Sequence, residues 1–112
     1  MGRARELAEE GVITDMIRVL DSFDLGIASM KEGSPERKGI EMIKIQFEDL
    51  LKGYGVEKIE KRIGEEFDPN REECIEQVDS KMHKVGKIVE QVESGYTYKG
   101  KVIKPTRVKI AK

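Results

Sequence analysis

The sequence predicts an α+β fold, in which a helical hairpin forms a dimeric four-helix bundle and is followed by a small, mostly antiparallel β domain. Apolar residues recur at helical spacing in the first half, and the second half changes to short Val- and Ile-rich segments divided by Gly and Pro. The 112 residues are 38% apolar and 38% charged, so each half has a thin core. We place a dimerisation domain at residues 1–55 and the β domain at residues 56–112.

The first predicted helix runs from about Arg3 to Met30. Its apolar residues follow one another at steps of three and four, the spacing of a bundle seam. They are Ile13, Met16, Leu20, Phe23, Ile27 and Met30.

A break over residues 31–36 separates this helix from a second one. Gly33 suits a helix C-terminus, Ser34 suits an N-cap and Pro35 suits the first helical position. The second helix ends at Gly53-Tyr54-Gly55. Its seam has the same spacing and comprises Ile40, Ile43, Phe47, Leu50 and Tyr54, with Leu51 beside it.

Two seams joined by a short loop predict an antiparallel hairpin, and two helices cannot enclose a core. A second copy would cover the seams across a two-fold axis. The predicted dimer interface is Ile13, Met16, Leu20, Phe23, Ile27, Ile40, Ile43, Phe47 and Leu50. The alternative is that the β half covers the hairpin within one chain.

The β half is predicted as short strands. Val56–Ile63, Glu73–Asp79 and Lys87–Glu93 have strand composition, and a polar loop through His83 and Gly86 joins the last two. Asp68-Pro69-Asn70 favours a turn. A hairpin turn at Lys99-Gly100 is expected between Tyr96–Tyr98 and Val102-Ile103, and a half-buried strand is expected through Val108 and Ile110.

Composition limits the setting and the class of protein. Cys74 is the one cysteine, so no disulfide can form within the chain, and no segment is long and apolar enough to span a membrane. We expect a cytoplasmic protein. The first 55 residues carry 8 Lys and Arg against 11 Asp and Glu, whereas residues 95–112 carry six basic residues and no acid.

Catalytic patterns are weak. The lone His83 lies in a predicted loop, Cys74 fits a small buried position, and no second His or Cys completes a zinc site or a nucleophile–base pair. Ser22 has no histidine near it, and Gly53-Tyr54-Gly55 lacks the rest of a phosphate-binding motif. Asp21 and Asp24 share a helix face, as paired catalytic acids can, but are more simply the solvated side of that helix. Glu65, Glu66 and Asp68 lack a regular ligand spacing for a cation. We predict no enzyme activity, no metal and no cofactor.

The basic C-terminal end raises nucleic-acid binding as an alternative function. Cations beside aromatic rings are the groups that hold single strands. Here Tyr96 and Tyr98 are interleaved with Lys99, Lys101, Lys104, Arg107 and Lys109. The chain as a whole is slightly acidic, with a net charge of −1, and the tyrosines alternate as core residues do. We therefore expect a protein partner in place of a nucleic acid.

Four blocks along the chain form an ordered set of motifs. They are Val19-Leu20-Asp21-Ser22-Phe23-Asp24, Gly39-Ile40-Glu41-Met42 with Tyr54-Gly55-Val56-Glu57, Phe67-Asp68-Pro69-Asn70, and Gly95-Tyr96 through Gly100-Lys101-Val102-Ile103-Lys104-Pro105 to Val108-Lys109-Ile110. Taken in this order, the blocks resemble the GrpE family, the nucleotide exchange factors of DnaK-type chaperones. The likeness covers essentially the whole chain, with the family's long N-terminal helix mostly missing. Glu72 stands where the family usually has a histidine, and Lys101 and Lys104 stand where it usually has arginines.

This resemblance implies a homodimer whose β domain, the family's β-wing, binds the ATPase domain of a DnaK-type chaperone, opens its cleft and releases ADP. A conformational role of this kind needs no covalent chemistry. The resemblance also implies the contact residues: Lys101 and Ile110 first, then Lys104, Pro105 and Arg107, and Gly39 at the start of the second helix.

Overall fold

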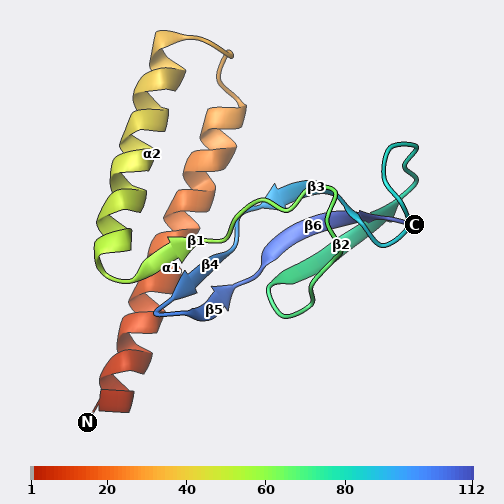
Figure 1. The fold of residues 1–112 in the computed structure, drawn as a ribbon. Coiled ribbons are helices and arrows are strands. Elements are labelled where there is room, and N and C mark those ends of the chain that lie inside the picture. Colours follow the sequence, from red (N-terminus) through yellow and green to blue (C-terminus); the bar gives the residue numbers. More distant parts are fainter. Residues whose placement is uncertain (1) are drawn as a thin grey trace. The chain divides into compact units, whose positions relative to one another are not determined.

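The fold is that of a computed structural model, which describes residues 2–112, apart from the side chains of Arg3 and Glu6. Helices α1 (Gly2–Ala28) and α2 (Pro35–Gly53) come first. Strands β1 (Val56–Lys58), β2 (Glu72–Val78), β3 (Ile88–Glu93), β4 (Tyr96–Tyr98), β5 (Lys101–Lys104) and β6 (Thr106–Ala111) follow (Figure 1). The chain divides into a first unit that ends at Glu57 and a second unit from Lys58 to Lys112.

The first unit is an antiparallel helical hairpin (Figure 1). The buried apolar residues of α1 are Ile13, Ile17, Leu20 and Ile27, at steps of four, three and seven, which place them on one helical face. An ion pair joins Lys44 of α2 to Asp24 of α1. Asp24 therefore pairs with a lysine, in keeping with a structural role for the acid.

Local chemistry at the turn starts α2 where the sequence predicts. The Arg37 backbone N–H donates to the Ser34 hydroxyl at 3.2 Å, and Pro35 occupies the first turn. The Arg37 guanidinium also donates to the Met30 carbonyl at 3.2 Å. Gly33 was expected to end the first helix, but α1 ends at Ala28. Gly33 instead takes the left-handed conformation, with φ 77°, in the loop before Ser34.

The end of α2 follows the prediction, whereas the strand after it is shorter than predicted. The Tyr54 N–H donates to the Leu51 carbonyl, and Gly55 adopts a φ of 93° that turns the chain out of the helix. A strand was predicted from Val56 to Ile63, but β1 ends at Lys58. This prediction was wrong beyond Lys58, because the next residues form a loop whose backbone bonds are scattered: the Ile59 N–H donates to the Gly95 carbonyl and the Gly64 N–H to the Ile88 carbonyl.

The strands form one sheet of order β1-β4-β5 and another of order β2-β6-β3, as found for the described residues 2–112. The sequence predicts mostly antiparallel pairing, and β3–β6 and β4–β5 are antiparallel. The β2–β6 pair is parallel, with Cys74 opposite Val108 and Gln77 opposite Ile110. Strand β6 therefore lies between the other two strands, and its Val108 is buried, as is Ile88 of β3.

Neither helix is long and apolar enough to cross a membrane, judged over the residues that the structure describes.

Candidate functional site

Lys101 begins β5 directly after a tight hairpin turn. Lys99 and Gly100 both have positive φ, 50° and 83°, which is the backbone of a type I′ turn and matches the twist of the flanking strands. The Lys99 ammonium lies 5.2 Å from the centre of the Tyr98 ring. Lys101 is exposed, so the turn presents its side chain at the end of the β4–β5 hairpin.

The chain crosses between the two sheets at two adjoining points, residues 94–95 and Pro105. At this crossover, a Cβ added to Gly95 would lie 2.4 Å from the Thr106 backbone nitrogen and 2.9 Å from the Lys104 carbonyl oxygen. Both Gly95 and Thr106 are buried. Only glycine allows the two passing strands to approach this closely.

One face of the β2-β6-β3 sheet is a row of cations between two rows of acids. Lys109 lies 3.4 Å from Glu76 on β2 and 3.9 Å from Glu90 on β3. Arg107 and Lys104 both approach Glu93, at 3.7 and 3.6 Å. Of the basic residues that suggested nucleic-acid binding, Lys104, Arg107 and Lys109 thus have carboxylate partners within the second unit, which argues against that alternative.

A β-bulge in each outer strand creates this arrangement. Residues three apart in a strand normally point to opposite faces. The register shifts in β2 between Cys74 and Glu76, and in β3 between Gln91 and Glu93. As a result, acids three residues apart, which are Glu73 and Glu76 in β2 and Glu90 and Glu93 in β3, lie on the same face as Arg107 and Lys109. Nothing in the sequence indicates the bulges, so the pairing of these acids with the cations of β6 could not be predicted from it.

The predicted β-wing contact residues do not form one patch. Ile110 is opposite Ile88 and on the same side of β6 as Val108, whereas Arg107 points to the charged face. Lys101 belongs to the β1-β4-β5 sheet and is the first residue of β5, whereas Ile110 lies near the end of β6. Lys104 and Pro105 are half-buried between the two sheets. The structure therefore brings Lys104 and Arg107 together through Glu93 and leaves Lys101 and Ile110 apart.

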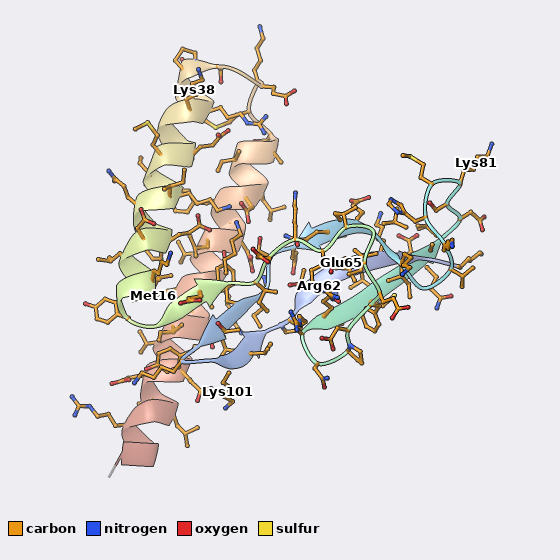
Figure 2. The ribbon with its side chains drawn as sticks, in the orientation of Figure 1. Met16, Lys38, Arg62, Glu65, Lys81 and Lys101 are labelled. Atoms are coloured by element: carbon orange, nitrogen blue, oxygen red, sulfur yellow. The ribbon has the colours of Figure 1, made fainter. Side chains whose placement is uncertain are left out.

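A buried ion pair that sequence reasoning missed fixes the loop before β2. The Glu72 side chain is 1% exposed and accepts from the Arg62 guanidinium at 2.7 Å and from the Asp68 backbone N–H at 2.8 Å. Arg62 also lies 3.9 Å from Glu65 (Figure 2). In place of the histidine that the resemblance leads one to expect, Glu72 links this loop to the start of β2.

The Asp68-Pro69-Asn70 turn is confirmed. The Asn70 backbone N–H donates to Asp68 at 2.9 Å, and the Arg71 guanidinium lies 2.9 Å from the same carboxyl group. These contacts, chiefly the Asn70 hydrogen bond, lower the pKa of Asp68. A lowered pKa stabilises the fold above the ordinary Asp pKa, and this contribution is lost as the pH falls through the lowered value.

Replacing Glu72 with alanine is expected to destabilise the second unit by about 3 kcal/mol, because the Asp68 N–H would lose its acceptor and Arg62 would keep only the longer contact to Glu65. Chemical denaturation followed by circular dichroism measures the change. The adjacent Glu73 is exposed and forms no ion pair within the described residues, so Glu73→Ala is the matched control. Equal stability of the two variants would contradict the role of the buried pair.

The helices of the first unit expose an apolar stripe. In α1, the exposed Val12, Met16 and Val19 each immediately precede a buried isoleucine or leucine. In α2, the exposed Leu50 likewise precedes the buried Leu51, and Ile43 precedes the largely buried Lys44. One residue is a rotation of about 100°. Because the helices are antiparallel, the same rotation brings both stripes to one side of the hairpin.

The predicted dimer residues divide between this stripe and the hairpin's own packing. Met16, Ile43 and Leu50 are exposed, and Phe23, Ile40 and Phe47 are half-buried. Ile13, Leu20 and Ile27 are already buried within the single chain, as is Ile17, which the seam spacing missed. Gly39 lies exposed on α2, and an added Cβ would meet nothing within 4 Å, so no tight packing within this chain requires a glycine there.

The remaining candidates for chemistry have ordinary surroundings. His83 lies against Gly64, the Cys74 thiol donates to the Glu76 carbonyl at 3.4 Å, and the Ser22 hydroxyl donates to the Arg18 carbonyl at 3.2 Å. Over the residues that the structure describes, no group of three or more His, Cys, Asp or Glu side chains could hold a metal ion.

Comparison with known proteins identifies the family. The chain is 38% identical to Protein GrpE of Thermotoga maritima over 93% of its own length and 59% of the relative's. It is 35% identical to Protein GrpE of Methanosarcina barkeri, over 100% of this chain and 55% of the relative, and 32% identical to that of Bacillus subtilis, over 98% and 60%. The chain thus spans somewhat over half the length of these relatives. Because the GrpE family pattern also matches residues 2–112, the chain belongs to the GrpE family.

Proposed function

We propose that this chain is an adenine-nucleotide exchange factor, which dimerises and binds the ATPase domain of a DnaK-type chaperone to release ADP. The observation that carries the proposal is the match to the GrpE family over residues 2–112. The tight turn that presents Lys101 and the apolar stripe on the helices support the two halves of the proposal, which are partner binding and dimerisation.

The mechanism is a shift of population. A protein that binds the open form of the nucleotide cleft more tightly than the closed form favours opening by the difference in binding free energy, and bound ADP then leaves more readily. The β domain acts in this scheme as a preformed surface. Its cross-strand ion pairs and the Glu72–Arg62 link hold that surface before binding, which lowers the entropy lost on association.

Dimerisation follows from the uncovered stripe. Val12, Met16, Val19, Ile43 and Leu50 would expose adjoining apolar surface on a monomer in water, and a two-fold axis along this side of the hairpin would bury both copies of it. The result is a four-helix bundle with one β domain on each protomer.

The direct test is ADP release from a DnaK-type chaperone. Stopped-flow fluorescence of a labelled ADP, chased with unlabelled nucleotide, should show faster release when this chain is added. An unchanged rate together with a stable dimer would favour the reading that these residues only dimerise and that exchange requires further parts of the longer relatives.

Lys101→Glu is expected to weaken binding of the chaperone ATPase domain by about tenfold, because reversing a charge at a complementary interface slows association and adds repulsion. The dimer should remain intact. Isothermal titration calorimetry measures the affinity. Lys61→Glu is the matched control, since Lys61 is also an exposed lysine of the second unit. An equal loss in both variants would remove the contact assigned to Lys101.

A further inference from the structure

The loop between β2 and β3, residues 79–87, exposes two apolar side chains at its tip. Met82 is 89% and Val85 78% exposed, the highest values of any large apolar side chain among the described residues. Apolar groups that protrude together in this way mark contact sites more often than scattered surface residues do. None of the contact residues assigned in the proposed function lies in this loop.

The loop is held in shape by its own hydrogen bonds. The Ser80 hydroxyl accepts from the backbone N–H groups of Met82, at 3.2 Å, and His83, at 3.1 Å. At its base, the Gly86 N–H donates to the Ala111 carbonyl at 2.9 Å, and Gly86 adopts a φ of 86°. An exposed apolar tip on an ordered loop loses little entropy when it binds a partner.

The charges around the tip differ from those on the neighbouring sheet. Lys81, Lys84 and Lys112 are exposed and form no ion pair within residues 58–112, all of which the structure describes. Lys112 is at the base of the loop, because its N–H donates to the Val78 carbonyl at 3.0 Å. By contrast, Arg107 and Lys109 on β6 have acidic partners. The lysines near the tip are therefore available to carboxylates of another molecule.

We propose that this loop, residues 79–87, is a second docking element, which inserts Met82 and Val85 into an apolar recess rimmed by carboxylates on the chaperone ATPase domain. This inference rests on the proposed function. A folded protein fits better than a nucleic acid, which offers phosphates but no apolar recess. It also fits better than a lipid surface, because two side chains bury little apolar area there. Lys81 and Lys101 lie at opposite ends of the second unit (Figure 2), so the loop is separate from the Lys101 contact.

The first test replaces the apolar tip. In the full chain, Met82→Ser with Val85→Ser should raise the Kd for the ATPase domain by about tenfold, as removal of buried interface anchors does. Both side chains are exposed, so thermal unfolding should match the unsubstituted protein. Leu25→Ser is the matched control, because Leu25 is as exposed as Val85 but lies on α1. Its Kd should not change.

The second test replaces the lysines. Lys81→Gln with Lys84→Gln should slow association by about threefold and flatten its salt dependence, because long-range attraction acts mainly on the association rate. Lys61→Gln should leave both quantities unchanged. Surface plasmon resonance at two salt concentrations measures the rates.

The outcomes distinguish a failure of the docking role from a failure of the proposed exchange function on which it rests. If Lys101→Glu weakens binding while the Met82 and Val85 substitutions leave Kd unchanged, the exchange function stands and the docking role of the loop is wrong. If the unsubstituted chain does not bind the ATPase domain, both fail together. A lipid surface would be indicated if the chain floated with phosphatidylserine vesicles and the Met82 and Val85 substitutions abolished this flotation. If the same substitutions left the Kd for the ATPase domain unchanged, the proposal would be overturned.

Discussion

Substituting both Met16 and Leu50 with glutamate is expected to convert a dimer into a monomer in sedimentation-velocity experiments. Leu50 is 62% exposed and Met16 38% exposed in the single chain, so apolar surface of both side chains is left uncovered. In a two-fold dimer each substitution occurs twice, and the interface would bury four carboxylates. We expect the dissociation constant to rise about a thousandfold or more, since each unpaired buried charge opposes association by several kcal/mol.

Leu25→Glu is the matched control for the dimer. Leu25 is 76% exposed on the same helix as Met16, but it lies outside the stripe. This variant should remain dimeric, with the helical circular dichroism of the unsubstituted protein. A dimer that survives the Met16 and Leu50 substitutions would mean that the two copies meet elsewhere, or that the stripe is covered within one chain.

Gly95→Ala is expected to destabilise the second unit by roughly 3 kcal/mol or more, because the added methyl group would overlap backbone atoms of the passing strand. The Cβ would lie 2.4 Å from the Thr106 nitrogen and 2.5 Å from its hydroxyl oxygen. A unit of this size has a free energy of unfolding of roughly 3 to 8 kcal/mol. The substitution therefore removes a large part of the stability, or all of it.

Hydrogen exchange followed by mass spectrometry resolves where that loss falls. Amides of β3 to β6 should exchange faster in Gly95→Ala, while amides of α2 should keep their protection. Gly11→Ala is the control: an added Cβ there meets nothing within 4 Å, and alanine in a helix is favoured over glycine by about 1 kcal/mol. Unchanged protection in β3 to β6 would show that the crossover tolerates a methyl group.

Much of the fold follows from short-range chemistry that the sequence displays. Ser34 and Pro35 start α2 as capping rules predict, and Lys99-Gly100 forms the expected hairpin turn. The Asp68 turn is also as expected. Each of these features depends on a few adjacent residues whose preferred dihedral angles and hydrogen bonds do not depend on the rest of the chain.

Features that depend on distant residues were not predictable. Met16 and Ile17 are both apolar, and the helical spacing alone does not show that Ile17 is buried while Met16 is left exposed. The parallel β2–β6 pair joins segments far apart in the chain, and its bulge after Cys74 leaves no mark in the hydrophobic pattern. The Arg62–Glu72 pair likewise requires knowledge of how the loop folds back.

The place of β6 in the sheet has a consequence for protein synthesis. Because β2 and β3 both pair with β6 and not with each other, neither can join a sheet until residues 106–111 have left the ribosome. The helical hairpin pairs neighbouring segments and can form earlier. A translation product that stops before Thr106 would therefore contain paired helices followed by strands with bare edges, which are prone to aggregation and open to proteases.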